Sequence, residues 1–353
     1  MTTMRACVMR RGRLEVDDTP DPRPETGQML VRTLACGICG SDLHFLRHGE
    51  TMVSMTDEML PSMGPATMGM APIDLSRDIV MGHEFCAEVL ELGPDTSGPR
   101  PGTRVVSVPV LLSSTGLHQL AYNNAYPGGY AQYMVLSAPL ALEVPNGLDT
   151  RHAALTEPLA VGIHAVARSG ATARDGAVVV GCGPVGLAVV AALRAVGVES
   201  IVAADLSPTR RAMARTMGAV EAVDPAEEGV VDAWHRLDGR RPLVAFEAVG
   251  VPGMIQQMLH DLPSGTRVTV VGVCMEPDRI LPFFAIAKEL SLHFAMAYGP
   301  DEFAGALRAL AEGDIDASPM ITGTVDLDGV PGAFESLARP DEHVKILVEP
   351  AAT

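Results

Sequence analysis

Residues 176–205 read GAVVVGCGPVGLAVVAALRAVGVESIVAAD, and this stretch predicts the fold of the second half of the chain. An apolar run at 177–180 precedes a glycine-rich turn, an apolar helical stretch over about 185–196 and a second strand over 200–205. A strand, a helix and a strand in this order form a βαβ unit, the start of a parallel doubly wound sheet. The sequence therefore predicts an α/β fold.

The glycine-rich turn, Gly181-Cys-Gly183-Pro184-Val185-Gly186, fits the GxGxxG dinucleotide pattern in its expected place between strand and helix. Glycines there allow a tight turn and close approach to a pyrophosphate at the helix N-terminus. An acid, Asp205, follows 19 residues after Gly186 (205 − 186). Its carboxylate would bind the adenosine ribose 2′-OH and repel a 2′-phosphate, which favours NAD over NADP.

Two arginines weaken this preference. Arg210 and Arg211 follow Asp205 closely, and a cation near the ribose accommodates a 2′-phosphate. Asp205 could instead be an ordinary surface residue that precedes a helix whose N-cap is Ser207. This role and ribose binding do not exclude each other.

Flanking segments extend the sheet and indicate a second domain. Apolar segments at 243–248, 267–273 and 292–297 predict further strands, and the tail predicts a helix over 302–311 and a strand over 344–348. Before the βαβ unit, period-two segments predict antiparallel strands. These lie at 29–34, 87–92, 104–108 and 130–136.

Three short motifs carry metal-ligating side chains: CGICGSDLH at 36–44, GHE at 82–84 and TEP at 156–158. A lone cysteine or histidine is usually a packing residue, but thiolate, imidazole and carboxylate together suit a tetrahedral zinc. No second CxxC pair completes a zinc finger. An open catalytic site with three protein ligands is therefore favoured.

In this order, GICGSDLH, GHE, EPLAVGIHAV and VVVGCGPVGLAVVAALRAVG resemble the zinc-dependent medium-chain alcohol and polyol dehydrogenases, in particular the sorbitol and threonine dehydrogenase-like branch. The resemblance runs along nearly the whole chain. It implies a GroES-like β-rich catalytic domain (1–157 and 299–353), an inserted Rossmann domain (158–298) and an active site in the cleft between them.

The resemblance also implies residue roles. Cys39 and His83 would bind zinc, while Glu84 and Glu157 would bind it directly, through water or in exchange. Ser41 would take the alcohol proton and His44 would pass it through the cofactor ribose to solvent. Asp42 would either orient the His83 ring or cap the following turn.

The implied activity is oxidation of a secondary or primary alcohol with NAD, in either direction, with zinc as the Lewis acid. Two alternatives remain: a catalytically silent cofactor-binding or interaction protein, and a zinc-independent enone reductase. The complete set of catalytic residues disfavours both. The set comprises Cys39, Ser41, His44, His83 and Glu84.

The chain departs from most relatives in two places. Residues 95–130 lack the four cysteines of a structural zinc lobe, so we expect one catalytic zinc per chain and leave open whether the homo-oligomer is a dimer or a tetramer. An insertion between His44 and Gly82 carries six methionines over residues 52–70, with Pro61 predicted to end a helix near Leu60. Either it packs as core, or it covers the cleft for a bulky, apolar substrate. The methionines are Met52, Met55, Met59, Met63, Met68 and Met70.

Composition limits the class of protein. At 353 residues with 47% hydrophobic and 20% charged residues, the chain suits two globular domains. The net charge of −17 disfavours a nucleic-acid partner. Without a signal peptide, membrane span or disulfide framework, we expect a cytoplasmic enzyme with a small-molecule alcohol or carbonyl substrate and no membrane partner.

Overall fold

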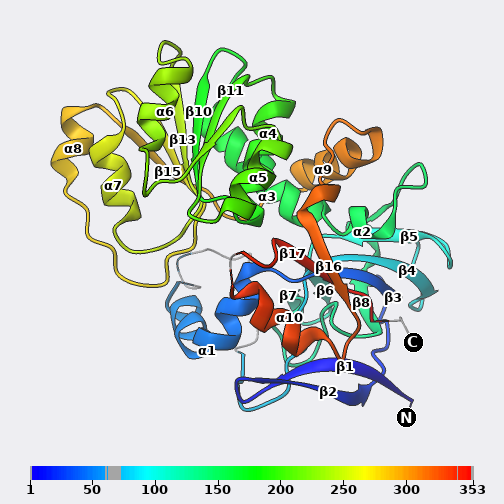
Figure 1. Ribbon diagram of the computed structural model, residues 1–353. Helices are drawn as coiled ribbons and strands as arrows, with labels where there is room; N and C mark the ends of the chain where they lie inside the picture. The colour runs from blue at the N-terminus through cyan, green and yellow to red at the C-terminus, as the bar shows by residue number, and fades with distance from the viewer. Residues whose placement is uncertain (1, 60–61, 63–72, 340, 351–353) are drawn as a thin grey trace. The chain divides into compact units, whose positions relative to one another are not determined.

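The computed structural model describes residues 2–59, 62, 73–339 and 341–350. The chain forms two compact units, each with its own sheet (Figure 1). Unit 1 comprises Met1–Glu157, Ile321–Arg339 and Lys345–Thr353, and unit 2 comprises Pro158–Met320 and Pro340–Val344.

Unit 2 is built on a six-stranded parallel sheet, ordered β12-β11-β10-β13-β14-β15. The predicted strand–helix–strand is present as β10, α4 (Pro184–Ala195) and β11, and the doubly wound prediction is confirmed. β10 and β13 pair at the centre, where the strand order reverses. The strands are β10 (Gly176–Val180), β11 (Ser200–Ala204), β12 (Glu221–Val223), β13 (Leu243–Glu247), β14 (Arg267–Val270) and β15 (Ser291–Phe294).

Helices flank this sheet and close its core. α4 contacts β10 and β11, and its run of buried residues from Gly186 to Leu193 explains the apolar sequence. Alternate residues of the central strands, such as Val178 and Val202, pack with Trp234. The other helices of unit 2 and its boundary are α3 (Thr156–Ser169), α5 (Pro208–Thr216), α6 (Val230–Leu237), α7 (Met254–Asp261), α8 (Pro282–Ala287), α9 (Pro300–Glu312) and the short η4 (Ser318–Met320).

Segment 299–320 lies in unit 2, whereas we predicted it in the catalytic domain. The reason is packing by α9. It buries an apolar face that includes Phe303 and Leu307, and Glu302 Oε2 lies 2.9 Å from His164 Nδ1 of α3. The return to unit 1 therefore begins only at Ile321.

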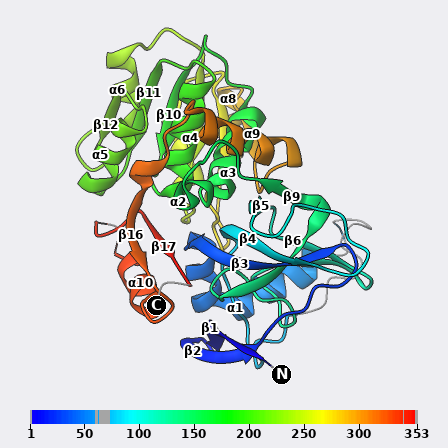
Figure 2. The ribbon, with the colours of Figure 1, turned by 90° about the vertical axis from the view of Figure 1, so that its right-hand side faces the viewer.

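Unit 1 holds a seven-stranded sheet ordered β16-β17-β3-β4-β5-β9, with β8 pairing to β3. Figure 2 shows β3 and β4 running side by side through it. The C-terminal strand β17 pairs with the end of β3, so Leu347 and Val348 lie beside residues 37 and 36. The strands are β3 (Gln28–Gly37), β4 (Glu84–Leu92), β5 (Arg104–Ser107), β8 (Tyr133–Ser137), β9 (Ala141–Glu143), β16 (Ile321–Val325) and β17 (Lys345–Val348).

Two hairpins and four helical segments complete unit 1. The segment 95–130, which lacks the expected cysteines, contains the hairpin of β6 (Val110–Ser113) and β7 (Gly116–Gln119). The other elements are β1 (Thr3–Arg10), β2 (Arg13–Pro20), α1 (Gly40–Met59), η3 (Ala138–Leu140), α2 (Thr150–Ala153) and α10 (Val330–Leu337).

α1 contains the start of the Met-rich insertion. The helix is interrupted at His48 (φ −130°, ψ 28°) and is described as far as Met59. Leu60 and Pro61, where we predicted that it ends, lie outside the described residues. Met52 packs against the unit 1 core, while Met55 and Met59 are each 43% exposed. Met63, Met68 and Met70 lie outside the described residues.

Across the described ranges, every helix is too short or too polar to cross a lipid bilayer.

Candidate metal centre and dinucleotide site

Sheet pairing brings the predicted metal ligands together. Cys39 follows β3, and His83 and Glu84 stand at the start of β4. Because Gly37 of β3 lies opposite Glu84 of β4, these two strand ends meet. One ligand atom each from Cys39, His83 and Glu84 all lie within 4.8 Å of one another, the one such group of three among the described residues.

Two glycines make this arrangement possible. Gly82 has φ +98°, a left-handed conformation that favours glycine, and an added Cβ would lie 2.7 Å from a ring carbon of Tyr130. At Gly37 an added Cβ would overlap the Glu84 carboxylate. Glycine at position 37 therefore leaves room for the Glu84 side chain, and glycine at position 82 leaves room for the Tyr130 ring and permits the left-handed backbone just before His83.

Asp42 is a fully buried carboxylate at the centre of a hydrogen-bond network. Its Oδ1 accepts from Tyr122 Oη at 2.7 Å, and its Oδ2 accepts from Tyr130 Oη at 2.7 Å and from the Cys39 amide at 3.0 Å. His83 Nδ1 lies 3.5 Å from Oδ1. Asp42 thus both faces the His83 ring and closes the local turn, so the two interpretations from the sequence hold together.

These contacts set the charge of Asp42. Burial by itself would raise the pKa of the carboxyl, but the attraction of His83, 3.5 Å away, and the hydrogen bonds from Tyr130 and Tyr122 outweigh it. The pKa of Asp42 therefore lies below its usual value, and the side chain is a carboxylate. With Nδ1 facing Asp42, the Nε2 atom of His83 is left to bind a metal.

Glu84 is paired with a buried lysine. Lys345 Nζ donates to both Glu84 carboxylate oxygens at 2.7 Å and to the Ile38 carbonyl at 3.1 Å. Burial alone would lower the pKa of Lys345, but the charges of Glu84 and Cys39 raise it above its usual value. Lys345 therefore competes with any metal for Glu84.

Ser41 and His44 lie in the first half of α1. Ser41 Oγ is 2.9 Å from Tyr122 Oη, within the Asp42 network. His44 is exposed and outside the three-ligand group. Partial burial, followed by the charges of His48 and Arg47, lowers the pKa of His44 below its usual value, so its imidazole is neutral at neutral pH.

Glu157, the fourth predicted ligand, stands in the first turn of α3 and is partly buried. It is not part of the three-ligand group. Its charge contributes to raising the pKa of Lys345, after the larger effects of burial and of Glu84.

The donor set fits zinc. Sulfur from Cys39, nitrogen from His83 and oxygen from Glu84 are the ligand types found in zinc sites, and three protein ligands leave a position for substrate. The other two cysteines near the ends of β3 and β4 do not fit this role. Cys36 and Cys86 are buried, and burial raises the pKa of both thiols, that of Cys86 to about 12.

In unit 2 the glycine-rich turn suits a dinucleotide phosphate. An added Cβ at Gly181 or Gly186 would clash with backbone, whereas one at Gly183 would meet no atom within 4 Å. Gly183 thus borders open space at the N-terminus of α4, where no side chain caps the helix. Pro184 and Val185 form the first turn of α4 beside this space. This is the arrangement that a pyrophosphate requires.

Asp205 is fixed to this turn. Its Oδ2 accepts from the Cys182 amide at 2.8 Å and its Oδ1 from the Ser207 amide at 2.8 Å. Arg211 is occupied, because it binds the Asp205 carbonyl and Asp224 Oδ2 at 2.8 and 3.0 Å. Arg210 Nε has no hydrogen-bond partner within the described part of the chain. Of the two arginines, Arg210 is therefore the one available to a ligand.

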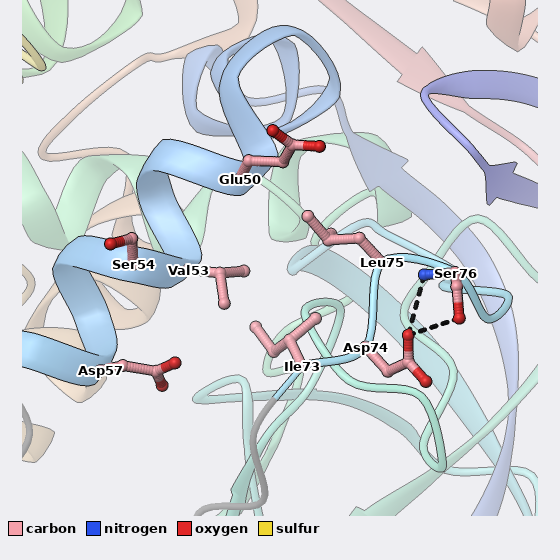
Figure 3. Close-up of a pocket in the computed structure, with 8 residues that line it drawn as sticks. All are labelled: Glu50, Val53, Ser54, Asp57, Ile73, Asp74, Leu75 and Ser76. Carbon is pink, nitrogen blue, oxygen red and sulfur yellow. Dashed lines mark hydrogen bonds between the residues drawn. The ribbon is translucent and has the colours of Figure 1, made fainter.

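A pocket of about 650 Å³ lies elsewhere in unit 1, between the second half of α1 and the segment 73–76 (Figure 3). Asp74 closes that segment by accepting from the Ser76 amide and hydroxyl at 2.9 and 2.6 Å. The lining includes none of the candidate site residues. It consists of Glu50, Val53, Ser54, Asp57, Ile73, Asp74, Leu75 and Ser76.

The sequence interpretation missed Tyr122, Tyr130 and Lys345. For Lys345 a signal existed, because the chain has only two lysines, Lys288 and Lys345, and Lys345 stands inside an apolar strand. A buried charge in a strand needs a partner. The tyrosines carried no such signal, since their contacts depend on how the segment after β7 folds.

Comparisons with known proteins agree with this geometry. Residues 25–146 match the alcohol dehydrogenase GroES-like domain and residues 184–312 the zinc-binding dehydrogenase domain. The chain is 32% identical to a (R,R)-butanediol dehydrogenase of Bacillus subtilis over 96% of both proteins. It is 27% identical to a sorbitol dehydrogenase of the same species over 98% of this chain and 97% of that protein.

A solved structure has the same fold over the full length. A zinc-binding dehydrogenase from Sinorhizobium meliloti bound to NADP superposes with a TM-score of 0.83 at 28% identity, covering 99% of this chain and 100% of that one. Sequence, fold and donor set agree. The chain therefore belongs to the zinc-dependent medium-chain alcohol and polyol dehydrogenase family, and it is an alcohol oxidoreductase.

Proposed function

We propose that the protein oxidises a secondary alcohol with NAD at a single zinc held by Cys39 and His83, and that it also runs in reverse. The observation that carries this proposal is the group of Cys39, His83 and Glu84 ligand atoms within 4.8 Å. The similarity to enzymes named for butanediol and sorbitol supports a diol or polyol substrate. A primary or bulkier apolar alcohol is the other substrate that the sequence favours.

Bound zinc would supply Lewis acidity that makes the alcohol hydroxyl more acidic. The chain's own residues do the rest. Asp42 holds the His83 ring by facing its Nδ1 atom, and Ser41 accepts the alcohol proton. His44, neutral because of its lowered pKa, receives that proton for release to solvent.

We assign NAD rather than NADP as the preferred cofactor, which would accept the hydride of the alcohol carbon. Asp205 supports this, because a carboxylate fixed to the glycine-rich turn opposes a 2′-phosphate. Gly181, Gly183 and Gly186 would hold the pyrophosphate at the start of α4.

The test combines metal analysis with turnover. We expect about one zinc per chain and formation of NADH with at least one member of a panel of butanediols, sugar alcohols, aliphatic alcohols and terpenoid alcohols. C39A should lose both zinc and turnover. C86A is the matched control, because Cys86 is a buried cysteine of the same strand region without a place in the ligand group.

Two results would contradict the proposal. One is a second tightly bound zinc per chain. The other is an unmodified protein without alcohol dehydrogenase activity. Such a protein would form no NADH or NADPH with any alcohol, or would reduce enones at the same rate with and without zinc.

A further inference from the structure

Tyr122 joins the proposed proton acceptor to the metal centre. Its hydroxyl lies 2.9 Å from Ser41 Oγ and 2.7 Å from Asp42 Oδ1. The residue follows the β6–β7 hairpin, in the segment that lacks the cysteines of most relatives. It is buried, and its ring centroid lies 4.8 Å from that of Phe45 and 5.6 Å from that of His83. Its position is therefore fixed by packing on two sides.

The proton positions in this chain of contacts follow from counting donors. Tyr122 Oη donates its single proton to Asp42 Oδ1 at 2.7 Å. In the Ser41–Tyr122 contact the donor must then be Ser41. A serine hydroxyl has one proton and two lone pairs. With its proton directed to Tyr122, Ser41 offers only lone pairs to any other group.

We infer that Tyr122 is a positioning residue: it holds the Ser41 proton, so that the Ser41 oxygen meets the substrate hydroxyl as a hydrogen-bond acceptor. This inference rests on the proposed function. In the step, the alcohol O–H bond breaks as its proton bonds to Ser41 Oγ, and at the same time the original Ser41 O–H bond breaks as that proton leaves Tyr122 and passes toward His44. The incoming proton becomes the new hydroxyl proton of Ser41, which Tyr122 then holds.

The protein contains a matched control. Tyr130 also donates to Asp42 at 2.7 Å and is also buried, but the second neighbour of its hydroxyl is the Gly37 carbonyl at 3.4 Å, not Ser41. Y122F and Y130F each remove one hydrogen bond to Asp42 while keeping the aromatic ring. Only Y122F also removes the partner of Ser41.

The experiment is a double-mutant cycle on the zinc-loaded enzyme, with kcat for alcohol oxidation measured for Y122F and Y130F alone and in the S41A background. We expect Y122F to lower kcat by about tenfold, the size of one positioning hydrogen bond, and to have little further effect in S41A. Y130F should have the same smaller effect in both backgrounds. KM should change little in Y122F, because binding of the substrate's carbon skeleton does not depend on Ser41.

A second measurement does not depend on turnover. Zinc retention of each variant, measured by competition with a chromophoric chelator, reports how well Asp42 still supports His83. We expect equal retention in Y122F and Y130F. A selective loss of zinc in Y122F would show that the residue acts through the metal ligands, and it would overturn the inference.

The inference and the proposed function fail differently. No NADH or NADPH formation by the unmodified protein with any alcohol would refute the function. The inference alone would be refuted by an active protein in which Y122F lowers kcat by the same factor with and without S41A. It would also be refuted if Y122F and Y130F lowered kcat by the same factor.

Discussion

Lys345 Nζ lies 2.7 Å from both carboxylate oxygens of Glu84, across 261 positions of sequence. The two side chains are 0% and 1% exposed. The pair joins the last strand of unit 1 to the first residue of β4, beside the proposed metal ligand His83. A buried ion pair of this kind costs desolvation to form, but it is costly to break.

Removing the lysine should therefore destabilise the protein. We expect K345M to lower the free energy of unfolding of the metal-free protein by about 3–5 kcal/mol, because Glu84 is left charged and buried. The double variant K345M/E84Q should recover most of this loss. Urea titrations followed by circular dichroism measure both.

An exposed ion pair supplies the control. Arg5 and Asp328 are 49% and 62% exposed, so R5M should cost no more than about 1 kcal/mol. Equal losses in K345M and R5M would mean that the Glu84–Lys345 pair has no special structural role.

Gly37 should tolerate no side chain. Because an added Cβ would overlap Glu84, G37A should displace the carboxylate, cost roughly 1–3 kcal/mol and weaken zinc retention. G40A is the control three residues away, where an added Cβ meets nothing within 4 Å. Thermal unfolding and chelator competition on both variants check this, and unchanged zinc retention in G37A would contradict it.

Cofactor choice should follow Asp205. We expect D205A to raise the ratio of kcat/KM for NADP to that for NAD by at least tenfold, because the charge opposing the 2′-phosphate is lost. D205A/R210A should reverse part of that gain, since the positive charge of Arg210 near the ribose would attract the 2′-phosphate.

R211A is the control for R210A, because it removes the other arginine that follows Asp205. Arg211 already binds the Asp205 carbonyl and Asp224, so its loss should lower stability more than it changes the cofactor ratio. An unmodified enzyme that uses NADP as well as NAD would show that Arg210 outweighs Asp205.

The acidic limb of the pH–rate profile should report His44. The imidazole accepts a proton only when neutral, so alcohol oxidation should fall as pH drops through a pKa that lies below the usual histidine value. R47Q removes one of the positive charges that lower this pKa, after the larger effect of burial. The limb should therefore move to higher pH.

NMR titration of the His44 ring and kcat measured against pH test this together. R100Q, an exposed arginine that does not act on His44, should leave the limb in place. A limb that moves equally in R47Q and R100Q would assign it to another group.

Local sequence patterns were enough for most of the fold. The βαβ unit at 176–205 and the strands over 29–34, 87–92 and 243–248 follow from periodicity and glycine placement, because these depend on neighbouring residues alone. The candidate ligands Cys39, His83 and Glu84, which the structure brings within 4.8 Å of one another, were recognisable in the same way, by residue type and motif order.

Tertiary structure decided the rest. Segment 299–320 joins unit 2 through side-chain packing of α9, which its helical pattern does not reveal. Lys345 reaches Glu84 only because β17 pairs with β3 and β3 pairs with β4. Tyr122 reaches Ser41 and Asp42 only through the path of the chain after β7. Partners 80 or more positions apart are chosen by sheet order and core packing, which depend on the whole chain at once, so no local pattern specifies them.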